Sequence, residues 1–282
     1  MTSARKEITA HVSWDPESLL AQPILGSMRS QIAKLSSHEF PDLAALNALA
    51  QSLYSASGAP IRFVPTFAAS RSFEEHYEVR VYRQGAIGTR ARNWHDLFNA
   101  LVWLSFPNTK ATLNARHYEE ISRRSGNPLR GTARDVLTLF DEGGVFVASA
   151  NEELLALLRA ERWKDLFWGR RADVKRWMRF CVFGHAIMEK ALSPYAGITA
   201  KALIVDVDDD FLHADDAAQR AALDRAGVSC FLGDAVLQST RSLAPLPILG
   251  IPGWTPDNES PDYYDDVRQF RPPRHLRGRA DS

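Results

Sequence analysis

The fold is decided by one stretch of sequence, Asn93-Trp-His-Asp-Leu-Phe-Asn-Ala-Leu-Val-Trp-Leu-Ser105. At about 100° per residue, His95, Asp96 and Asn99 fall within roughly a third of the circumference of a helix, and the other sides are apolar. Such a helix is normally buried, so its few polar side chains need partners inside the protein. The stretch therefore predicts a helix over 93–105 that lines a polar cavity.

The next segment repeats this pattern. On a helix predicted over 109–124, Lys110, Asn114 and His117 share one face, whereas Arg116 and Glu119 lie on another. We therefore expect Lys110, Asn114 and His117 to point inward.

A third helix is predicted over 172–192, where His185 and Glu189 share a face with apolar residues such as Met178. A buried polar group without a partner costs about 1–3 kcal/mol. Three helices that each bury polar side chains must satisfy them mutually or through a ligand, water or metal. Convergence of the three helices on one pocket is the economical prediction.

Composition excludes several classes of protein. The chain has 282 residues, 45% of them hydrophobic, and its 34 basic residues balance 34 acidic ones. With no net charge, the chain is expected to have no overall electrostatic attraction to nucleic acid or to a membrane. It has no signal-peptide pattern and no apolar run of about 18 residues, so a cytoplasmic location is expected. Cys181, in a helical pattern, and Cys230, in a strand-like one, are predicted to be buried thiols.

The other patterns predict a single α+β domain. Helices are expected over 17–34, 41–56 and 214–226; strands over 202–207 and 228–232; and hairpins over 77–89 and over 136–149, the second with its turn at 141–144. Ser149 is expected to cap a helix, with Glu152 completing a capping box. The Pro-rich, aromatic segment 243–274 is predicted to wrap the pocket. The organisation is thus a helical cover (1–59), a main domain (60–275) and a disordered tail (276–282).

Five stretches carry a resemblance to a known family. They are Asn93-Trp-His-Asp-Leu-Phe-Asn-Ala-Leu-Val-Trp, Phe106-Pro-Asn-Thr-Lys-Ala-Thr-Leu-Asn-Ala-Arg-His117, Arg134-Asp-Val-Leu-Thr-Leu-Phe-Asp-Glu142, Gly184-His-Ala-Ile-Met-Glu-Lys190 and Pro247-Ile-Leu-Gly-Ile-Pro-Gly-Trp254. Together they resemble the uncharacterised bacterial family called domain of unknown function 3025, over about residues 60–275. The resemblance implies a cytoplasmic bacterial protein and no particular reaction.

Each candidate residue also has a purely structural interpretation. Asn93 is a good N-cap, and Asp96 would satisfy the first N–H groups of the same helix. His117 could be a core histidine bonded to a backbone carbonyl, and His185 with Glu189 could be an internal pair that only stabilises its own helix.

Weaker motifs favour ordinary structural roles. Asp141 and Glu142 are predicted to lie in a solvated turn, and Asp206-Val-Asp-Asp-Asp210 in a charged loop. Asp265, Asp266 and Arg271 could form a lid or pin the C-terminal segment by salt bridges. The sequence has no Walker phosphate loop, no Gly-x-Ser-x-Gly elbow, no His-Glu-x-x-His motif and no Cys-x-x-Cys pair.

Three function classes follow. The first is a metal-assisted hydrolase, in which His95, Asp96, His117 and His185 bind a divalent ion and Glu189 or Asp141 is the general base. The dipeptide His95-Asp96 is similar to the His-Asp pair of HD-type metal phosphohydrolases.

The second class is a metal-free acid–base enzyme, in which His185 and Glu189 act together and Lys110, with Asn99 or Asn114, binds a substrate anion or carbonyl. The third is a binding or structural protein whose polar network only fixes the fold. A small-molecule substrate is expected for an enzyme, with neither nucleic acid nor membrane as partner; a divalent metal is the one cofactor considered. Oligomeric state and substrate stay open.

Overall fold

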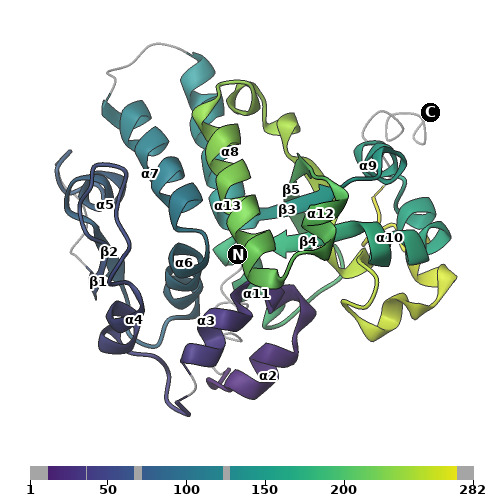
Figure 1. Cartoon of the computed structure of the whole chain (residues 1–282), viewed down its shortest axis with the longest axis horizontal. Coiled ribbons are helices and arrows are strands. Elements are labelled where there is room, and N and C mark those ends of the chain that lie inside the picture. Colours follow the sequence, from purple (N-terminus) through teal and green to yellow (C-terminus); the bar gives the residue numbers. More distant parts are fainter. Residues whose placement is uncertain (1–11, 36, 67–71, 123–127, 272–282) are drawn as a thin grey trace.

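The computed structural model describes residues 12–35, 37–66, 72–122 and 128–271. The described residues form a single body of many helices and two small sheets (Figure 1), which confirms the α+β class. The tail predicted over 276–282 lies outside the described residues. No described helix combines the length and the apolar character needed to span a bilayer.

The larger sheet has the strand order β4-β3-β5-β6, with β3 and β5 parallel and the outer pairs antiparallel. Its strands are β3 (Gly144–Ser149), β4 (Met178–Val182), β5 (Thr199–Asp206) and β6 (Ala244–Pro247). Every residue of β3 is buried, as expected of a central strand covered on both faces. The strands predicted over 145–149 and 202–207 are confirmed.

The smaller sheet pairs β1 (Arg62–Pro65) with β2 (Ala86–Thr89) in parallel. The hairpin predicted over 77–89 is wrong, because Tyr77–Gln84 forms the helix α5, which ends at Gly85 in the left-handed conformation (φ 65°). Tyr82 of α5 stacks on Tyr118 with ring centroids 4.1 Å apart. Packing against the neighbouring helix outweighs the β propensity of the Val and Tyr residues.

Two predicted helices are confirmed. Helix α6 (Trp94–Ser105) has Asn93 as its N-cap, and α7 (Pro107–Ser122) follows at once, since Pro107 begins α7 as well as ending α6. Between them the chain turns at Phe106, which is fully buried.

The second predicted hairpin is half wrong. Residues 136–140 belong to helix α8 (Pro128–Gly143), and only 145–149 form a strand. Among the side chains of α8 that the structure describes, the buried ones are Ala133, Val136, Leu137 and Phe140, at the spacing i, i+3, i+4 and i+7 of an amphipathic helix. Asp141 and Glu142 therefore lie on the last turn of a helix and not in a hairpin loop.

The helix predicted over 172–192 is also wrong. This segment contains helix α10 (Arg171–Trp177), strand β4 and helix α11 (His185–Ala191). The extended residues of β4 are held by antiparallel pairing with β3, a long-range contact that periodicity cannot reveal.

The remaining helices cover the sheets. Near the N-terminus lie α2 (Pro16–Ala21), a 3₁₀ helix (Pro23–Met28), α3 (Arg29–Lys34) and α4 (Leu43–Leu49), which replace the two longer predicted helices. Further along are α9 (Glu152–Arg159), a π turn (Asp165–Gly169), α12 (Asp209–His213) and α13 (Asp216–Leu232).

Three local predictions need correction. The N-cap of α9 is Asn151 and not Ser149, whose hydroxyl instead donates to the Trp177 carbonyl. The strand predicted over 228–232 is the last turn of α13, so Cys230 lies on a helix and Cys181 on β4. Both thiols are free and only partly buried. Within the predicted acidic loop, Asp208 is the N-cap of α12.

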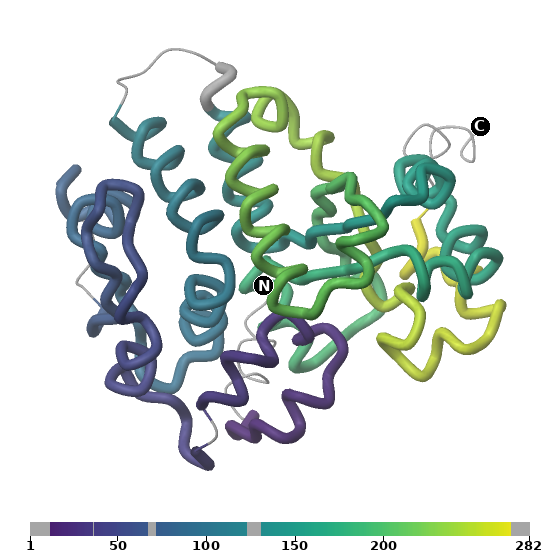
Figure 2. Tube along the Cα trace, in the orientation of Figure 1, coloured from purple at the N-terminus to yellow at the C-terminus, as the bar shows by residue number. Residues whose placement is uncertain are grey.

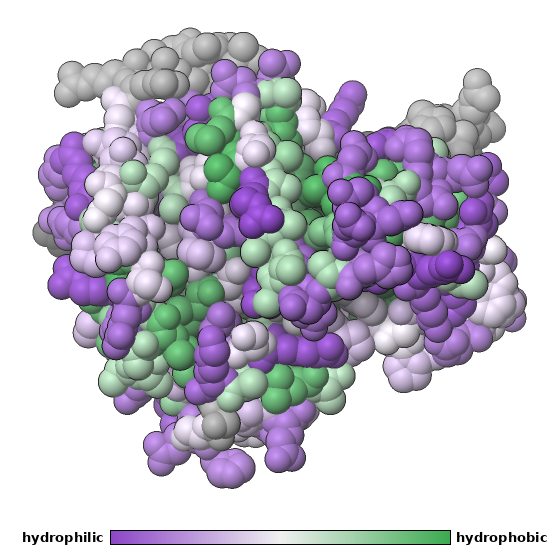
Figure 3. All heavy atoms as spheres, viewed as in Figure 1, coloured by the Kyte–Doolittle hydropathy of each residue, from purple (hydrophilic) through white to green (hydrophobic). Residues whose placement is uncertain are grey.

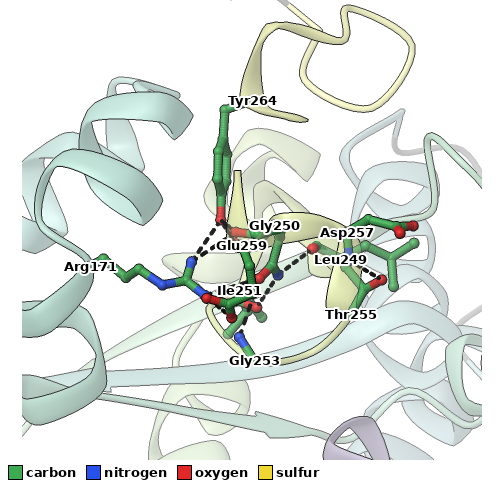
Figure 4. Close-up of polar contacts among 10 residues, drawn as sticks. Arg171, Leu249, Gly250, Ile251, Gly253, Thr255, Asp257, Glu259 and Tyr264 are labelled. Atoms are coloured by element: carbon green, nitrogen blue, oxygen red, sulfur yellow. Dashed lines mark hydrogen bonds and ion pairs between the residues drawn. The ribbon is translucent and has the colours of Figure 1, made fainter. Parts of the chain in front are cut away.

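The C-terminal segment does not wrap the polar site. Figures 1 and 2 place it at the end of the molecule opposite α5, β1 and β2, and Figure 4 shows it anchored by Arg171. The Arg171 guanidinium donates to the carbonyl of Asn258, to its side chain and to the Tyr264 hydroxyl, and it also contacts Glu259. Asn258 in turn donates to two backbone carbonyls of the segment. This network binds the segment to α10.

Salt bridges also involve the same segment, which confirms this one of the two predicted alternatives for Asp265 and Asp266, whereas no salt bridge to the described residues tests it for Arg271. Lys164 pairs with Asp265 at 2.6 Å, and Arg268 pairs with Asp266 at 2.8 Å. The segment consists of β6 and short 3₁₀ helices over Ile248–Gly250, Pro256–Glu259 and Pro261–Asp265.

Candidate functional site

The predicted polar residues converge on a cavity of about 340 Å³, here called the site cavity. It is lined by Thr66, Tyr77, Glu78, Gly88, Arg90, His95, Asp96, Asn99, His117, Thr138, Asp141, Glu142 and His185. These residues come from α5, β2, α6, α7, α8 and α11 and the adjoining loops. Lys110 and Asn114 lie just behind the cavity, and Glu189 is linked to it by a hydrogen bond with His95.

Two histidines and a carboxylate form a hydrogen-bonded array. The Nδ1 atom of His95 lies 3.0 Å from Glu189 Oε2, and its Nε2 atom lies 3.1 Å from Nε2 of His185. The two rings are almost perpendicular, with centroids 4.4 Å apart. His185 and Glu189 are buried, as predicted, whereas the His95 side chain is 35% exposed. The sequence paired His185 with Glu189, but the structure places His95 between them.

Gly184 sets the position of His185. A Cβ atom on Gly184 would lie 2.5 Å from the Glu142 carbonyl oxygen and 2.5 Å from the Gly144 nitrogen, so only glycine allows this approach. The contact holds the start of α11 against the end of α8. As a result, His185 Nδ1 lies 3.8 Å from Asp141 Oδ2.

Lys110 crosslinks two other walls of the cavity. Its ammonium group donates to Asn99 Oδ1 at 2.8 Å and to Asp141 Oδ1 at 2.6 Å, and it lies 5.5 Å from the Trp103 ring centroid. The Lys110 side chain is only 5% exposed. Lys110 therefore fixes Asn99 and Asp141, and its contacts are made within the protein.

The charge of Lys110 also sets the protonation of Asp141. Burial alone would raise the pKa of Asp141, but the nearby Lys110 ammonium and His185 outweigh it and hold the pKa below its usual value. Asn99 continues the network by donating to the Tyr77 hydroxyl at 3.2 Å.

Asn114 positions a carboxyl group with an unusual pKa. Its Nδ2 atom donates to Glu78 Oε2 at 2.6 Å and to the Glu78 carbonyl at 3.0 Å. Burial raises the pKa of Glu78 to about 7, although the hydrogen bond from Asn114 opposes this shift. Glu78 is thus a cavity-lining carboxyl group whose pKa lies near neutral pH.

His117 and His185, the two buried histidines of the cavity wall, stay neutral. Burial lowers the pKa of His117 to about 4, and it lowers the pKa of His185 to about 4 despite the nearby Asp141 carboxylate. His117 is buried at the cavity wall, as predicted. Both imidazoles can therefore accept or donate a hydrogen bond without carrying charge.

The structural interpretation holds for Asn93, the N-cap of α6, but not for Asp96, whose carboxylate accepts from Arg90 and not from the first N–H groups of the helix. The Asn93 side chain accepts from the Asp96 backbone N–H at 3.0 Å, and the Asp96 carboxylate receives two bonds from the Arg90 guanidinium, each of 2.8 Å. Burial would raise the pKa of Asp96, but the bonds from Arg90 lower it.

The four residues proposed as metal ligands do not form one ligand set in this arrangement. His95 and His185 are in contact, whereas Asp96 is bonded to Arg90 and His117 belongs to another wall. Within the described ranges, no group of three or more His, Cys, Asp or Glu side chains is placed to hold a metal ion.

The sequence patterns did not indicate Tyr77, Glu78 and Arg90, and they placed Asp141 in the wrong environment. Tyr77 and Glu78 were hidden because α5 has a strand-like composition. A signal for Asp141 was available, since the apolar residues before it have helical spacing that puts Asp141 on the last turn of α8. No local signal identifies Arg90, whose role depends on its contact with Asp96.

Comparison with known proteins identifies one family. The sequence model described as "Protein of unknown function (DUF3025)" matches residues 61–274, well over half of the chain, as the resemblance predicted. Neither the search of curated proteins nor the search of solved structures gave a match. The chain therefore belongs to the DUF3025 family.

Proposed function

We propose that this chain is a metal-independent acid–base enzyme that moves a proton to or from a small molecule bound in the site cavity. The observation that carries the proposal is the array Glu189–His95–His185 at the cavity wall, with contacts of 3.0 and 3.1 Å. A carboxylate that orients one ring nitrogen of a histidine leaves the other nitrogen poised for proton transfer.

The array has two protonation states that differ by one proton. In the first, neutral His95 donates from Nδ1 to Glu189 and accepts at Nε2 from His185. In the second, His95 is an imidazolium that donates to both neighbours, and neutral His185 turns its Nδ1–H toward Asp141. Uptake of one proton thus reverses the bond between the rings, and both carboxylates then face N–H groups.

His95 is the member of the array assigned to contact the substrate. Its side chain is 35% exposed, whereas those of Glu189 and His185 are 10% and 8% exposed. A substrate group that replaces His185 as the partner of His95 Nε2 would exchange its proton there. Glu78, with a pKa of about 7, is a second proton-exchanging group on the opposite helix α5.

Metabolite profiling tests this proposal even though the substrate is unidentified. Purified protein is incubated with a bacterial small-molecule extract, and compounds consumed or formed are followed by mass spectrometry. We expect at least one change that the wild type produces and His95→Gln does not, with His38→Gln, at an exposed position, as the matched control. The proposal fails if no compound changes or if His95→Gln acts like the wild type.

A metal-assisted hydrolase is the second candidate. It is favoured by one feature, the two Nε2 atoms of His95 and His185 that face each other at 3.1 Å, with Glu189 bonded to the first imidazole and the Asp141 carboxylate 3.8 Å from Nδ1 of the second. Elemental mass spectrometry of protein purified without chelator separates the two candidates. A near-stoichiometric transition metal that is lost in His185→Gln supports this second candidate, and metal-free protein supports the first.

A further inference from the structure

A second, mainly apolar cavity adjoins the site cavity. This apolar cavity has a volume of about 440 Å³, and it shares two lining residues, Thr66 and Arg90, with the site cavity. Its wall includes Phe40, Leu43 and Leu46. Figure 3 shows hydrophobic residues on the viewed face in the region between α4 and α6. No pattern in the sequence indicated this cavity.

Helix α6 forms a wall of both cavities. Asn93 and Leu97 line the apolar cavity, whereas His95 and Asn99 line the site cavity. Residues four apart lie roughly 40° apart on a helix. The pair Asn93 and Leu97 is therefore on roughly the opposite flank from the pair His95 and Asn99, and position 96 lies between the two pairs. The helix therefore places an apolar surface on one flank and the proposed proton-transfer array on the other.

The Arg90–Asp96 pair lies where the two cavities meet. Asp96 accepts from Arg90 Nε and Nη2 at 2.8 Å and also from the Arg90 backbone N–H at 2.7 Å. Because Asp96 neutralises Arg90, this junction carries no net charge. The Arg90 side chain is 53% exposed, so the junction is open to solvent and a bound molecule can pass over it.

The charges of the site cavity favour a cationic ligand. Lys110 is paired with Asp141, and Arg90 is paired with Asp96. Glu142, exposed on the cavity wall, has no ion-pair partner among the residues that the structure describes. A carboxylate that no cation neutralises attracts a positive group and repels an anion.

In the apolar cavity the charged groups balance. Asp42 accepts from the Ala45 backbone N–H as the N-cap of α4, and Arg92 is an exposed cation of opposite sign. The remaining lining is predominantly apolar, so burial of a hydrocarbon group there is favourable.

We propose that the substrate is an amphipathic amine, with its alkyl or aryl group in the apolar cavity and its positively charged nitrogen in the site cavity. This inference deepens the proposed function by naming a substrate class for the same site. It rests on the proposed function only in that the bound amine is a substrate and not merely a ligand. Its binding component stands on the geometry and charge of the two adjoining cavities.

Calorimetric titration with simple probes tests the inference. The probes are butylamine, hexylamine and octylamine, compared with alkanoates of the same chain lengths at pH 7.5. We expect the amine affinity to rise about fourfold per added methylene until the apolar cavity is filled. Each amine should bind at least about tenfold more tightly than the matching alkanoate. Affinity that is independent of chain length, or alkanoates that bind as well as amines, would overturn the inference.

Variants assign the two halves of the ligand. Leu43→Asn should remove the dependence on chain length, whereas Leu49→Asn, on the same helix α4 but outside the cavity lining, should retain it. Thr66→Trp, at an exposed position that lines both cavities, provides a second block. Glu142→Gln should reduce the preference for amines over alkanoates. Unchanged binding in Leu43→Asn and Thr66→Trp would contradict the assignment.

His95→Gln separates this inference from the proposed function. Alkylamines should bind this variant with the same dependence on chain length, because His95 does not line the apolar cavity. If amines bind as expected but no compound is turned over, only the proposed enzymatic function fails. If turnover depends on His95 but no amine binds, only the substrate class is wrong.

Discussion

His117 should make the folded protein sensitive to acid. Folding keeps its imidazole neutral, because burial lowers its pKa from 6.5 to about 4. Between these two pH values the unfolded chain binds more protons than the folded chain, so the contribution of His117 to stability falls as the pH falls through this window. The full shift corresponds to about 3 kcal/mol.

Replacement of His117 by Leu removes this contribution while retaining a buried side chain of similar size. From pH 7 to pH 5, titration of His117 alone should lower the free energy of unfolding of the wild type by about 2 kcal/mol. With an m-value of about 3 kcal/mol/M, the urea midpoint should shift by about 0.7 M less in His117→Leu than in the wild type. Urea unfolding at pH 5, 6 and 7, followed by tryptophan fluorescence, measures this difference.

The comparison of variant with wild type isolates His117 from other titrating groups. His185 has the same lowered pKa, and Glu78 acts in the opposite direction, but both contributions cancel in the difference. His38→Gln, at an exposed position, serves as the control and should follow the wild type. If the pH dependence of His117→Leu equals that of the wild type, the neutral, buried state assigned to His117 is wrong.

Three further perturbations test the site and its support. The raised pKa of Glu78 makes the wild type lose stability as the pH rises. The free energy of unfolding of Glu78→Gln, relative to that of the wild type, should therefore increase by about 2 kcal/mol from pH 5 to pH 7.5. The same urea series would refute this if the difference between the two proteins did not depend on pH. Gly184→Ala should destabilise by about 2 kcal/mol or more, since its Cβ would overlap backbone atoms at 2.5 Å, whereas Gly143→Ala, with its nearest atom at 3.7 Å, should be nearly neutral in thermal unfolding. Asp224→Ala should cost about 3 kcal/mol, because the buried Asp224 carboxylate accepts from the backbone N–H groups of Asn108 and Thr109 at the start of α7; a urea-derived loss below about 1 kcal/mol would contradict that role.

Local sequence was sufficient for two of the helices that carry the site, α6 and α7. In α6 and α7 the apolar and polar positions have the helical period, Asn93 is an N-cap, and Lys110, Asn114 and His117 are buried as their face predicts. The reason is that any apolar surface can cover the apolar stripe of a helix. The pattern therefore specifies that the stripe is buried, whatever segment packs on it.

Elements whose conformation depends on distant partners were predicted incorrectly. Tyr77–Gln84 has the composition of a strand but is helical, and Met178–Val182 lies in a helical pattern but pairs with β3. In each case a contact far away in sequence outweighs local propensity, which amounts to less than about 1 kcal/mol per residue.

The sequence by itself indicated that polar groups of three segments would meet at one site, because burial of a polar group requires a partner. The tertiary structure decided which partner each group has. His95 contacts Glu189 and His185 across 94 and 90 residues, and Lys110 contacts Asp141 instead of remaining open to the cavity. Only the tertiary structure placed the apolar cavity beside this network, since its walls come from α4, β1 and α6 and no single segment contains its pattern. Periodicity reports which face of a helix is buried, and the approach of other segments determines what that face meets.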